Sequence, residues 1–312
     1  MNVDSGQSEK QREITMMLLE DGRGEFPDLH TLELPPELLR LYGTGLEFVR
    51  SPEGMTVPLT FVNFVVSKEG IYNLKDRPGG GAISGGNRAD AFGMAIFRAA
   101  ADAVMVGSGT VNGEPKHLWN LDFIFDKFPQ MQGLEELRAA FHRFRKGLAK
   151  KDKNPPTFFM TNSGDVNLDA VVFHDETTST YIVTGAQGAE NLARKYPDLA
   201  SRRPKVLVYG METLDEPAMM TDLRGRFNIK HLLHEGGPRV VNALMQKGLV
   251  HQFFLTQMKQ SPAGNLSPEI AQYLFSTPGH TIPPEAKIVT TRRDATGNAT
   301  LYNLDFRAVK QL

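Results

Sequence analysis

The sequence predicts an α/β fold with a mainly parallel central sheet, helices on both faces and an antiparallel C-terminal edge. Near-continuous apolar runs, of which residues 57–67 are the clearest, are typical of strands that are covered on both faces. Helical patterns alternate with such runs as far as residue 247, which is the rhythm of βαβ units. Beyond that point we expect strands at 251–259, 286–291 and 299–305, with a hairpin turn at Thr296-Gly297-Asn298 between the last two.

One run, residues 229–251, carries most of the functional interpretation. Residues 229–233 indicate a short buried strand, Gly236 and Gly237 follow as a turn, and Pro238 suits the first position of a helix. Free backbone N–H groups and the positive end of the helix dipole then point outward, which makes the turn a candidate phosphate site. The alternative is that the two glycines only let the chain bend, because the Gly-x-Gly-x-x-Gly spacing of dinucleotide-binding folds is absent.

Charged side chains are expected where the first strand and the first long helix end. The strand at 57–67 runs into Lys68-Glu69-Gly70, so Glu69 lies at the end where open α/β sheets bind ligands. A glycine-rich loop, residues 77–88, comes next and is either a lid or simply mobile. Asn87 suits the cap of a helix at 88–101, and Arg98 in its last turn is either a cation at a helix C-terminus or an anion contact.

The segment 103–111 predicts the next parallel strand and its exit turn. Thr110 and Glu114 are four residues apart, so a hydroxyl and a carboxylate lie on one side of the turn, and the Glu114 carboxylate suits the hydroxyls of a ribose. Further strands are expected at 157–161, 181–184 and 205–209, and helices at 186–195 and 216–223.

The chain divides into an N-terminal arm, residues 1–54, and one α/β domain, residues 55–312. We expect a short helix at 34–42 in the arm, starting at its prolines. The domain contains an insertion at about 115–154 that is first aromatic and then basic, and we expect it to cover one edge of the sheet. The basic cluster at 150–153 is interpreted as a solvated face.

Composition excludes several classes of function. The 312 residues carry a net charge of −1 and no long basic stretch, which argues against a nucleic-acid partner. Cysteine is absent, and none of the eight histidines forms a metal-ligand motif, so we expect no metal. No run approaches the roughly 20 apolar residues of a membrane span, and residues 1–20 do not resemble a signal peptide. We therefore expect a cytoplasmic protein with no membrane partner.

Residues 232–256 resemble the signature of the RibD C-terminal domain family, the pyrimidine reductases of riboflavin biosynthesis. Members of that family share the dihydrofolate-reductase-like fold and use NADPH. Three further regions resemble the family in the same order, namely 62–70, the pair 83–85 and 97–111, and 159–164. Together the resemblance covers residues 57–310, and it implies that NADPH lies across the C-terminal ends of the strands.

The resemblance also implies roles for individual residues. The positions that match cofactor contacts are Val66, Thr110, Glu114, Asn162 and, around the diphosphate, Gly236, Gly237, Pro238 and Arg239. Arg98, Leu118 and Glu235 match the substrate side. Glu69 and Glu235 are the candidate catalytic carboxylates, either as proton donors or as groups that orient the substrate; a proton donor needs a raised pKa.

The chain departs from the family at several positions. Pro115-Lys-His-Leu-Trp-Asn-Leu121 replaces the family's Pro-x-Leu-Thr-x-Arg, so Leu121 stands where an arginine helps to bind the substrate phosphate. Glu69 replaces the usual aspartate, and the deaminase domain that often precedes this module has no counterpart here.

Three functions follow as hypotheses. The first is an NADPH-dependent reductase similar to 5-amino-6-(5-phosphoribosylamino)uracil reductase. The second keeps the fold but changes the substrate, to dihydrofolate or to another carbonyl or imine. The third is a nucleotide-binding protein without turnover. Family members are typically dimers, and an apolar strand such as Phe253-Phe254-Leu255, expected at the C-terminal edge of the sheet, suits the interface of a homodimer.

Overall fold

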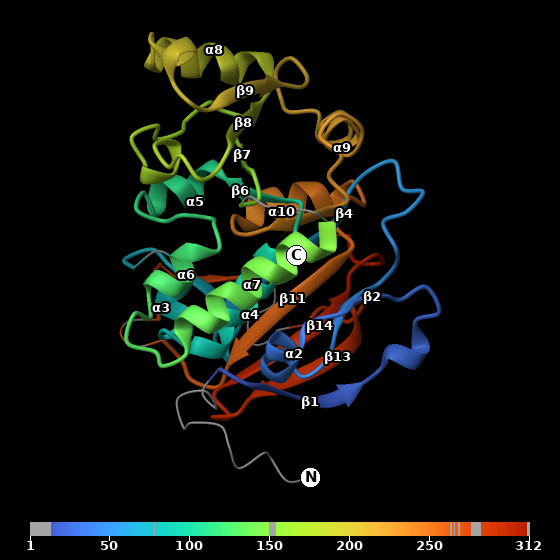
Figure 1. Ribbon diagram of the computed structural model, residues 1–312. Helices are drawn as coiled ribbons and strands as arrows, with labels where there is room; N and C mark the ends of the chain where they lie inside the picture. Colours follow the sequence, from blue (N-terminus) through green and yellow to red (C-terminus); the bar gives the residue numbers. More distant parts are fainter. Residues whose placement is uncertain are drawn as a thin grey trace.

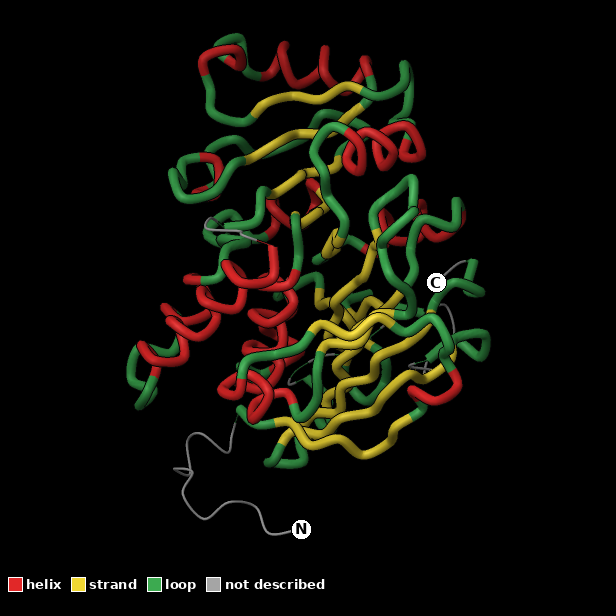
Figure 2. Tube along the Cα trace, turned by 45° about the vertical axis from the view of Figure 1, so that its right-hand side comes forward, coloured by secondary structure: helices red, strands yellow, loops and turns green. Residues whose placement is uncertain are grey.

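The computed structural model describes residues 14–77, 79–149, 154–262, 264, 266, 267, 269–275 and 282–310 (Figure 1). The predicted basic cluster at 150–153 lies outside these residues. One ten-stranded sheet runs through the molecule, with helices on both of its faces (Figure 2). Its strand order is β1-β13-β14-β11-β4-β10-β6-β7-β8-β9.

Seven neighbouring strands of the sheet are parallel, and three strands at one end are antiparallel. The parallel strands are β11 (Gln252–Met258), β4 (Leu59–Val66), β10 (His231–His234), β6 (Ala103–Gly107), β7 (Thr157–Met160), β8 (Thr180–Thr184) and β9 (Lys205–Val208). The antiparallel strands are β14 (Ala299–Asp305), β13 (Lys287–Asp294) and β1 (Met16–Asp21). The predicted α/β class, parallel centre and antiparallel edge are therefore confirmed.

Side-chain alternation along the strands divides the core into two layers. Along β4, Phe61 packs into one cluster and Val62 into the other. The Phe61 layer is covered by α4 (Arg88–Ala100), α2 (Pro36–Tyr42), α5 (Ser108–Gly113), α6 (Asp122–Asp126), α7 (Leu134–Ala149) and α8 (Ala186–Lys195). The Val62 layer is covered by α9 (Glu216–Gly225) and α10 (Pro238–Gln246).

Short elements fill the connections. Two small antiparallel pairs, β2 (His30–Leu32) with β3 (Leu46–Phe48) and β5 (Ile71–Leu74) with β12 (Ala271–Tyr273), lie outside the main sheet. The predicted glycine-rich loop contains a short helix, α3 (Gly80–Ser84), and the exit turn after β6 is the helix α5. Three 3-10 turns occur at η1 (Arg23–Glu25), η2 (Val171–Phe173) and η3 (Leu199–Ser201).

The described part of the predicted arm, residues 14–54, belongs to the sheet and to its core. β1 extends the sheet by pairing with β13 (Figure 1). Tyr42 and Phe48 are buried in the same cluster as Phe61, and the ring of Phe48 lies edge-on to that of Phe61 at 5.1 Å. The helix predicted at 34–42 is confirmed as α2. A domain boundary at residue 55 stays a prediction.

Two expectations about packing are wrong. The insertion packs on α4 instead of covering a sheet edge, because the rings of Phe125 and Phe141 both contact the ring of Phe92 on that helix. Residues 253–255 are not on an edge strand, since β11 lies between β14 and β4 and the three side chains are fully buried. They therefore cannot supply a dimer interface. None of the described helices is long and apolar enough to cross a bilayer.

Candidate functional site

The residues singled out in the sequence gather along one edge of the parallel strands. Glu69 follows β4, Glu235 follows β10, the helix α5 follows β6, and Asn162 lies two residues after β7. Parallel neighbours end at the same edge, so the sheet itself assembles these groups.

A buried ion pair joins two of the residues expected on the substrate side. Arg98, in the last turn of α4, donates from Nε and Nη2 to the carboxylate of Glu235, at 2.9 and 2.6 Å. Its Nη1 donates to the backbone carbonyls of Leu118 and Asn120, at 3.2 and 3.0 Å. Arg98 is fully buried. The guanidinium is therefore committed to protein acceptors, and Glu235 is the anion that it contacts in this structure.

His117 extends this pair toward Glu114. Arg98 Nη2 lies 3.0 Å from His117 Nε2, and His117 Nδ1 lies 3.1 Å from Glu114 Oε2. Because arginine has only donors, Nε2 must accept, and Nδ1 carries the proton that is donated to Glu114. Burial lowers the pKa of His117, which keeps the imidazole neutral. His117 was not among the predicted site residues. The sequence indicates its place in the site only by its position three residues after Glu114.

Glu69 is held by two serine hydroxyls. Ser67 Oγ donates to Glu69 Oε2 at 2.7 Å, and the Ser261 hydroxyl donates to Oε1. Burial raises the pKa of Glu69, but these hydrogen bonds outweigh burial, and the net pKa lies below its ordinary value. Glu69 is therefore ionised at neutral pH and suits an orienting role better than proton donation.

Asp90, in the first turn of α4, is a carboxyl that the sequence analysis did not single out. Burial raises its pKa to about 6; a hydrogen bond with Thr256 of β11 opposes that shift, and the negative charge of Glu235 adds to it. A carboxyl group with this pKa is partly protonated near neutrality. Asp90 therefore has the raised pKa that a proton donor needs.

The double-glycine turn has the shape of an anion cradle. Gly236 and Gly237 have φ values of +101° and +80°, which L-residues rarely adopt. A Cβ on Gly236 would lie 2.8 Å from Thr110 Oγ1, so β10 and α5 approach closely only because that atom is missing. Gly237 caps α10 with no side-chain hydrogen bond, and the first turn of α10 contains no acidic residue but an exposed Arg239.

That arrangement fits a bound anion. A cation in the first turn of a helix is electrostatically unfavourable, whereas an anion there is stabilised by the dipole and by free N–H groups. Within the described residues Arg239 makes no ion pair, and a diphosphate would give Arg239 and the N-cap of α10 an anionic partner.

The remaining predicted residues differ in their burial and in their contacts. Glu114 Oε1 lies against Gly79, where a Cβ would collide with the carboxylate, so the glycine-rich segment closes over Glu114. Val66 is fully buried, Leu118 is half-buried and Asn162 is exposed. The Oδ1 atom of Asn162 accepts a hydrogen bond from the backbone N–H of Leu214 at 2.9 Å. Leu121 is fully buried in the core, so no cation replaces the family arginine there.

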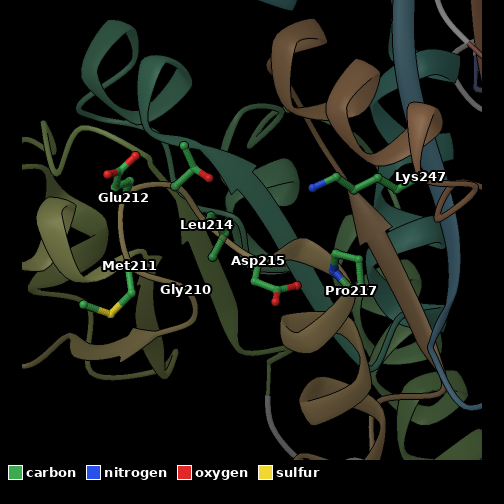
Figure 3. A pocket seen from close by; sticks show the side chains of 8 residues that line it. Gly210, Met211, Glu212, Leu214, Asp215, Pro217 and Lys247 are labelled. Carbon is green, nitrogen blue, oxygen red and sulfur yellow. The ribbon is translucent and has the colours of Figure 1, made fainter.

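A surface cavity of about 490 Å³ is lined in part by Leu214 (Figure 3), the residue whose backbone N–H donates to Asn162. Its lining consists of the loop after β9, residues 210–215, with Pro217 at the start of α9 and Lys247 at the end of α10. Lys247 reaches toward the loop in Figure 3 and pairs with Glu216. The lining includes none of the predicted site residues, so the cavity lies outside the predicted site.

The family model of the RibD C-terminal domain matches residues 59–258. A pyrimidine reductase-like protein from Corynebacterium diphtheriae is similar in structure at 18% identity and a TM-score of 0.55, covering 80% of this chain and 91% of that chain. RibD of Acinetobacter baumannii is similar at 14% identity and a TM-score of 0.52, over 80% of this chain and 58% of that chain. No curated protein matches by sequence.

A bifunctional deaminase and 5-amino-6-(5-phosphoribosylamino)uracil reductase from Thermotoga maritima is also similar, at 15% identity and a TM-score of 0.50, over 80% of this chain and 56% of that chain. At these identities the structural likeness shows a shared fold.

Proposed function

We propose, from the premise that the chain belongs to the RibD C-terminal domain family, that it is an NADPH-dependent pyrimidine reductase. Its substrate on this proposal resembles 5-amino-6-(5-phosphoribosylamino)uracil, the compound in the name of the Thermotoga maritima protein. Family members act on small molecules of riboflavin biosynthesis, and the expected form is a cytoplasmic homodimer.

The double-glycine turn is the observation that carries the proposal. Gly236 and Gly237 lead into α10, whose N-cap makes no side-chain hydrogen bond, Pro238 starts the helix, and Arg239 adds a positive charge there. We assign the cofactor diphosphate to this turn. Val66, Thr110, Glu114 and Asn162 would contact the rest of the cofactor along the same edge, with Glu114 near a ribose and the cavity beyond Asn162 toward the adenosine end.

The bound cofactor would supply a hydride. The residues of the chain orient the substrate, exclude water and donate a proton. Reduction of a carbonyl or imine carbon requires one proton on the neighbouring oxygen or nitrogen. Asp90, with its pKa near 6, is the proton donor that we favour. Glu235 and Glu69 then orient the substrate, Leu118 forms an apolar wall, and Arg98 acts through Glu235, with which it pairs.

Calorimetry and turnover test the proposal together. NADPH should bind with a lower Kd than NADH, and its oxidation should be followed with 5-amino-6-(5-phosphoribosylamino)uracil and, in parallel, with dihydrofolate. Turnover only with the first compound supports the proposal. Binding of neither nicotinamide cofactor would refute it.

The burial of Leu121 favours a second candidate. Since the position of the family's phosphate-binding arginine is apolar and lies in the core, a substrate without a phosphate is an alternative. Turnover with dihydrofolate or a simple carbonyl, and none with the phosphorylated pyrimidine, would select this candidate. NADPH binding without any turnover would select a nucleotide-binding protein instead.

A further inference from the structure

His117 links the two halves of the site. Its Nδ1 faces Glu114, which we assign to the cofactor, and its Nε2 faces Arg98, which holds Glu235 on the substrate side. The imidazole is fixed between two aromatic rings, with centroid distances of 4.7 Å to Trp119 and 4.4 Å to Phe123. In this orientation of the ring, each nitrogen has one charged partner.

We propose that His117 is a positioning residue that couples Glu114 to the Arg98–Glu235 pair. This inference rests on the proposed function for the identity of the two ligands, but the bridge itself is a property of the free protein. It belongs to this chain in particular, because residues 115–121 are the segment that departs from the family pattern.

The bridge works in one protonation state. Neutral His117 with a proton on Nδ1 donates to Glu114 and accepts from Arg98. A second proton on Nε2 would face an N–H of Arg98, so the hydrogen bond would be replaced by repulsion. The charged groups around the ring are Arg98 from α4, Glu114 after α5, Glu235 after β10 and Lys127, whose ammonium lies 4.5 Å from the Phe123 ring.

Coupling follows from the sharing of Glu114. His117 Nδ1 donates to Glu114 Oε2 and so orients the carboxylate for a ribose hydroxyl at its other oxygen; the two donors share one anion, so cofactor binding changes how strongly His117 holds Arg98 in place. Such coupling is reciprocal, so a substrate that engages Glu235 should change cofactor affinity by the same factor. The typical range for coupling between two sites is about 5- to 150-fold.

Three substitutions separate the two hydrogen bonds. His117→Gln places an acceptor near Arg98 but no donor at the Nδ1 position. His117→Asn places a donor near Glu114 but no acceptor at the Nε2 position. His117→Leu removes both the donor and the acceptor. We expect the Gln variant to raise mainly the Kd for NADPH and the Asn variant to raise mainly the KM for the phosphorylated pyrimidine, each about 10-fold. His117→Leu should do both and should remove the reciprocal effect.

A matched control is His142→Leu, which removes an exposed histidine of α7 that pairs with Asp122. It should leave the Kd and KM values and the pH profile as in the wild type. If the three His117 variants differ from the wild type only in thermal stability, His117 is structural and the proposal is overturned.

Nuclear magnetic resonance of labelled histidines tests the bridge without any ligand. The His117 signal, assigned by its loss in His117→Leu, should show the Nδ1–H tautomer, and Glu114→Gln should lower its pKa further by removing the nearby anion. An Nε2–H tautomer, or a pKa that does not respond to Glu114→Gln, would overturn the inference even if NADPH binds. Failure of NADPH to bind the wild type would instead refute the proposed function.

Discussion

Two buried arginine–glutamate pairs lie at different places in the sheet, one near its antiparallel end and one beside the central strand β10, and they differ in what surrounds them. Arg292 of β13 pairs with Glu47 of β3 at 2.7 Å, and both side chains are 0% exposed. Arg98 of α4 pairs with Glu235 at 2.6 Å, but Glu235 keeps 7% of its surface exposed at the C-terminal edge of the parallel strands.

The neighbours of the two pairs explain the difference. Arg292 is satisfied by the Tyr42 carbonyl, the hydroxyls of Thr44 and Thr290, and the face of the Tyr42 ring at 4.2 Å. The Arg98–Glu235 pair is instead surrounded by groups that titrate, such as His117 and Asp90. The Arg292–Glu47 pair is surrounded by neutral groups and by the permanent cation of Arg23, 3.5 Å from Glu47 Oε1, and it fixes the N-terminal segment, whereas the Arg98–Glu235 pair has neighbours whose charge responds to pH.

Substitution in the Arg292–Glu47 pair should give the largest loss of stability. Arg292→Met leaves Glu47 buried and charged without its main partner, which costs about 3–5 kcal/mol for a buried pair. Urea unfolding should show this loss, while NADPH affinity of the folded fraction stays unchanged. The double variant Arg292→Met with Glu47→Leu should recover most of the stability; if it does not, packing and not charge explains the loss.

Substitution in the Arg98–Glu235 pair should give a smaller loss of stability and a larger loss of activity. Glu235→Gln keeps an acceptor for Arg98 but removes the charge, which weakens charge-assisted hydrogen bonds by about 1.5–3 kcal/mol. We expect kcat/KM to fall about 100-fold, because the variant misplaces the substrate side of the site. Comparing unfolding free energy with kcat/KM for Glu235→Gln and Arg292→Met tests the contrast, and equal ratios for both would contradict it.

Asp90, near the Arg98–Glu235 pair, should make the stability of the protein depend on pH. Its folded pKa of about 6 lies above the ordinary 3.8, so the folded protein binds more protons than the unfolded chain between these values. Stability should therefore fall as pH rises from about 4 to 6 and should remain reduced above that range.

Asp90→Asn should remove that pH dependence. At pH 8 the variant should be about 1–2 kcal/mol more stable than the wild type, which is less than the full shift implies because Asp90 is partly exposed. If Asp90 is also the proton donor, turnover falls sharply in the same variant. A wild-type unfolding free energy that is flat from pH 4 to 6 would be inconsistent with the raised pKa.

Arg239 should give the smallest stability effect. Since a cation at a helix N-terminus is unfavourable, Arg239→Ala should leave stability unchanged or raise it by about 0.3–1 kcal/mol. The Kd for NADPH should rise about 10-fold through loss of a charged contact. Arg226→Ala, on the surface near α9, is a matched control that should leave NADPH affinity unchanged. An unaltered NADPH Kd in Arg239→Ala would remove Arg239 from the cofactor site.

Local patterns predicted the elements well but not their neighbours. Residues 57–67 contain the strand β4 because a strand covered on both faces needs a continuous apolar run. The turn at 236–237 and the helix cap at Asn87 were also predicted, since their signals lie within a few residues of the chain. The interior position of β11 was missed, because strand order depends on crossovers that no local pattern records.

The candidate site was predicted as a set of residues rather than as a network. Arg98 and Glu235 were both named, yet they are 137 residues apart, and nothing in the sequence indicates that they pair. His117 and Asp90 were missed because their properties come from burial and from neighbours on other elements. Whether the named residues bind cofactor and substrate stays a prediction.

The pairing of β1 with β13 has a consequence for how the chain matures. Met16 lies beside Asp294, so among the described strands β1 pairs with one that is synthesised roughly 280 residues later. Contacts this distant in sequence slow folding. Until β13 arrives, residues 16–21 are an unpaired edge that chaperones or other nascent chains can bind.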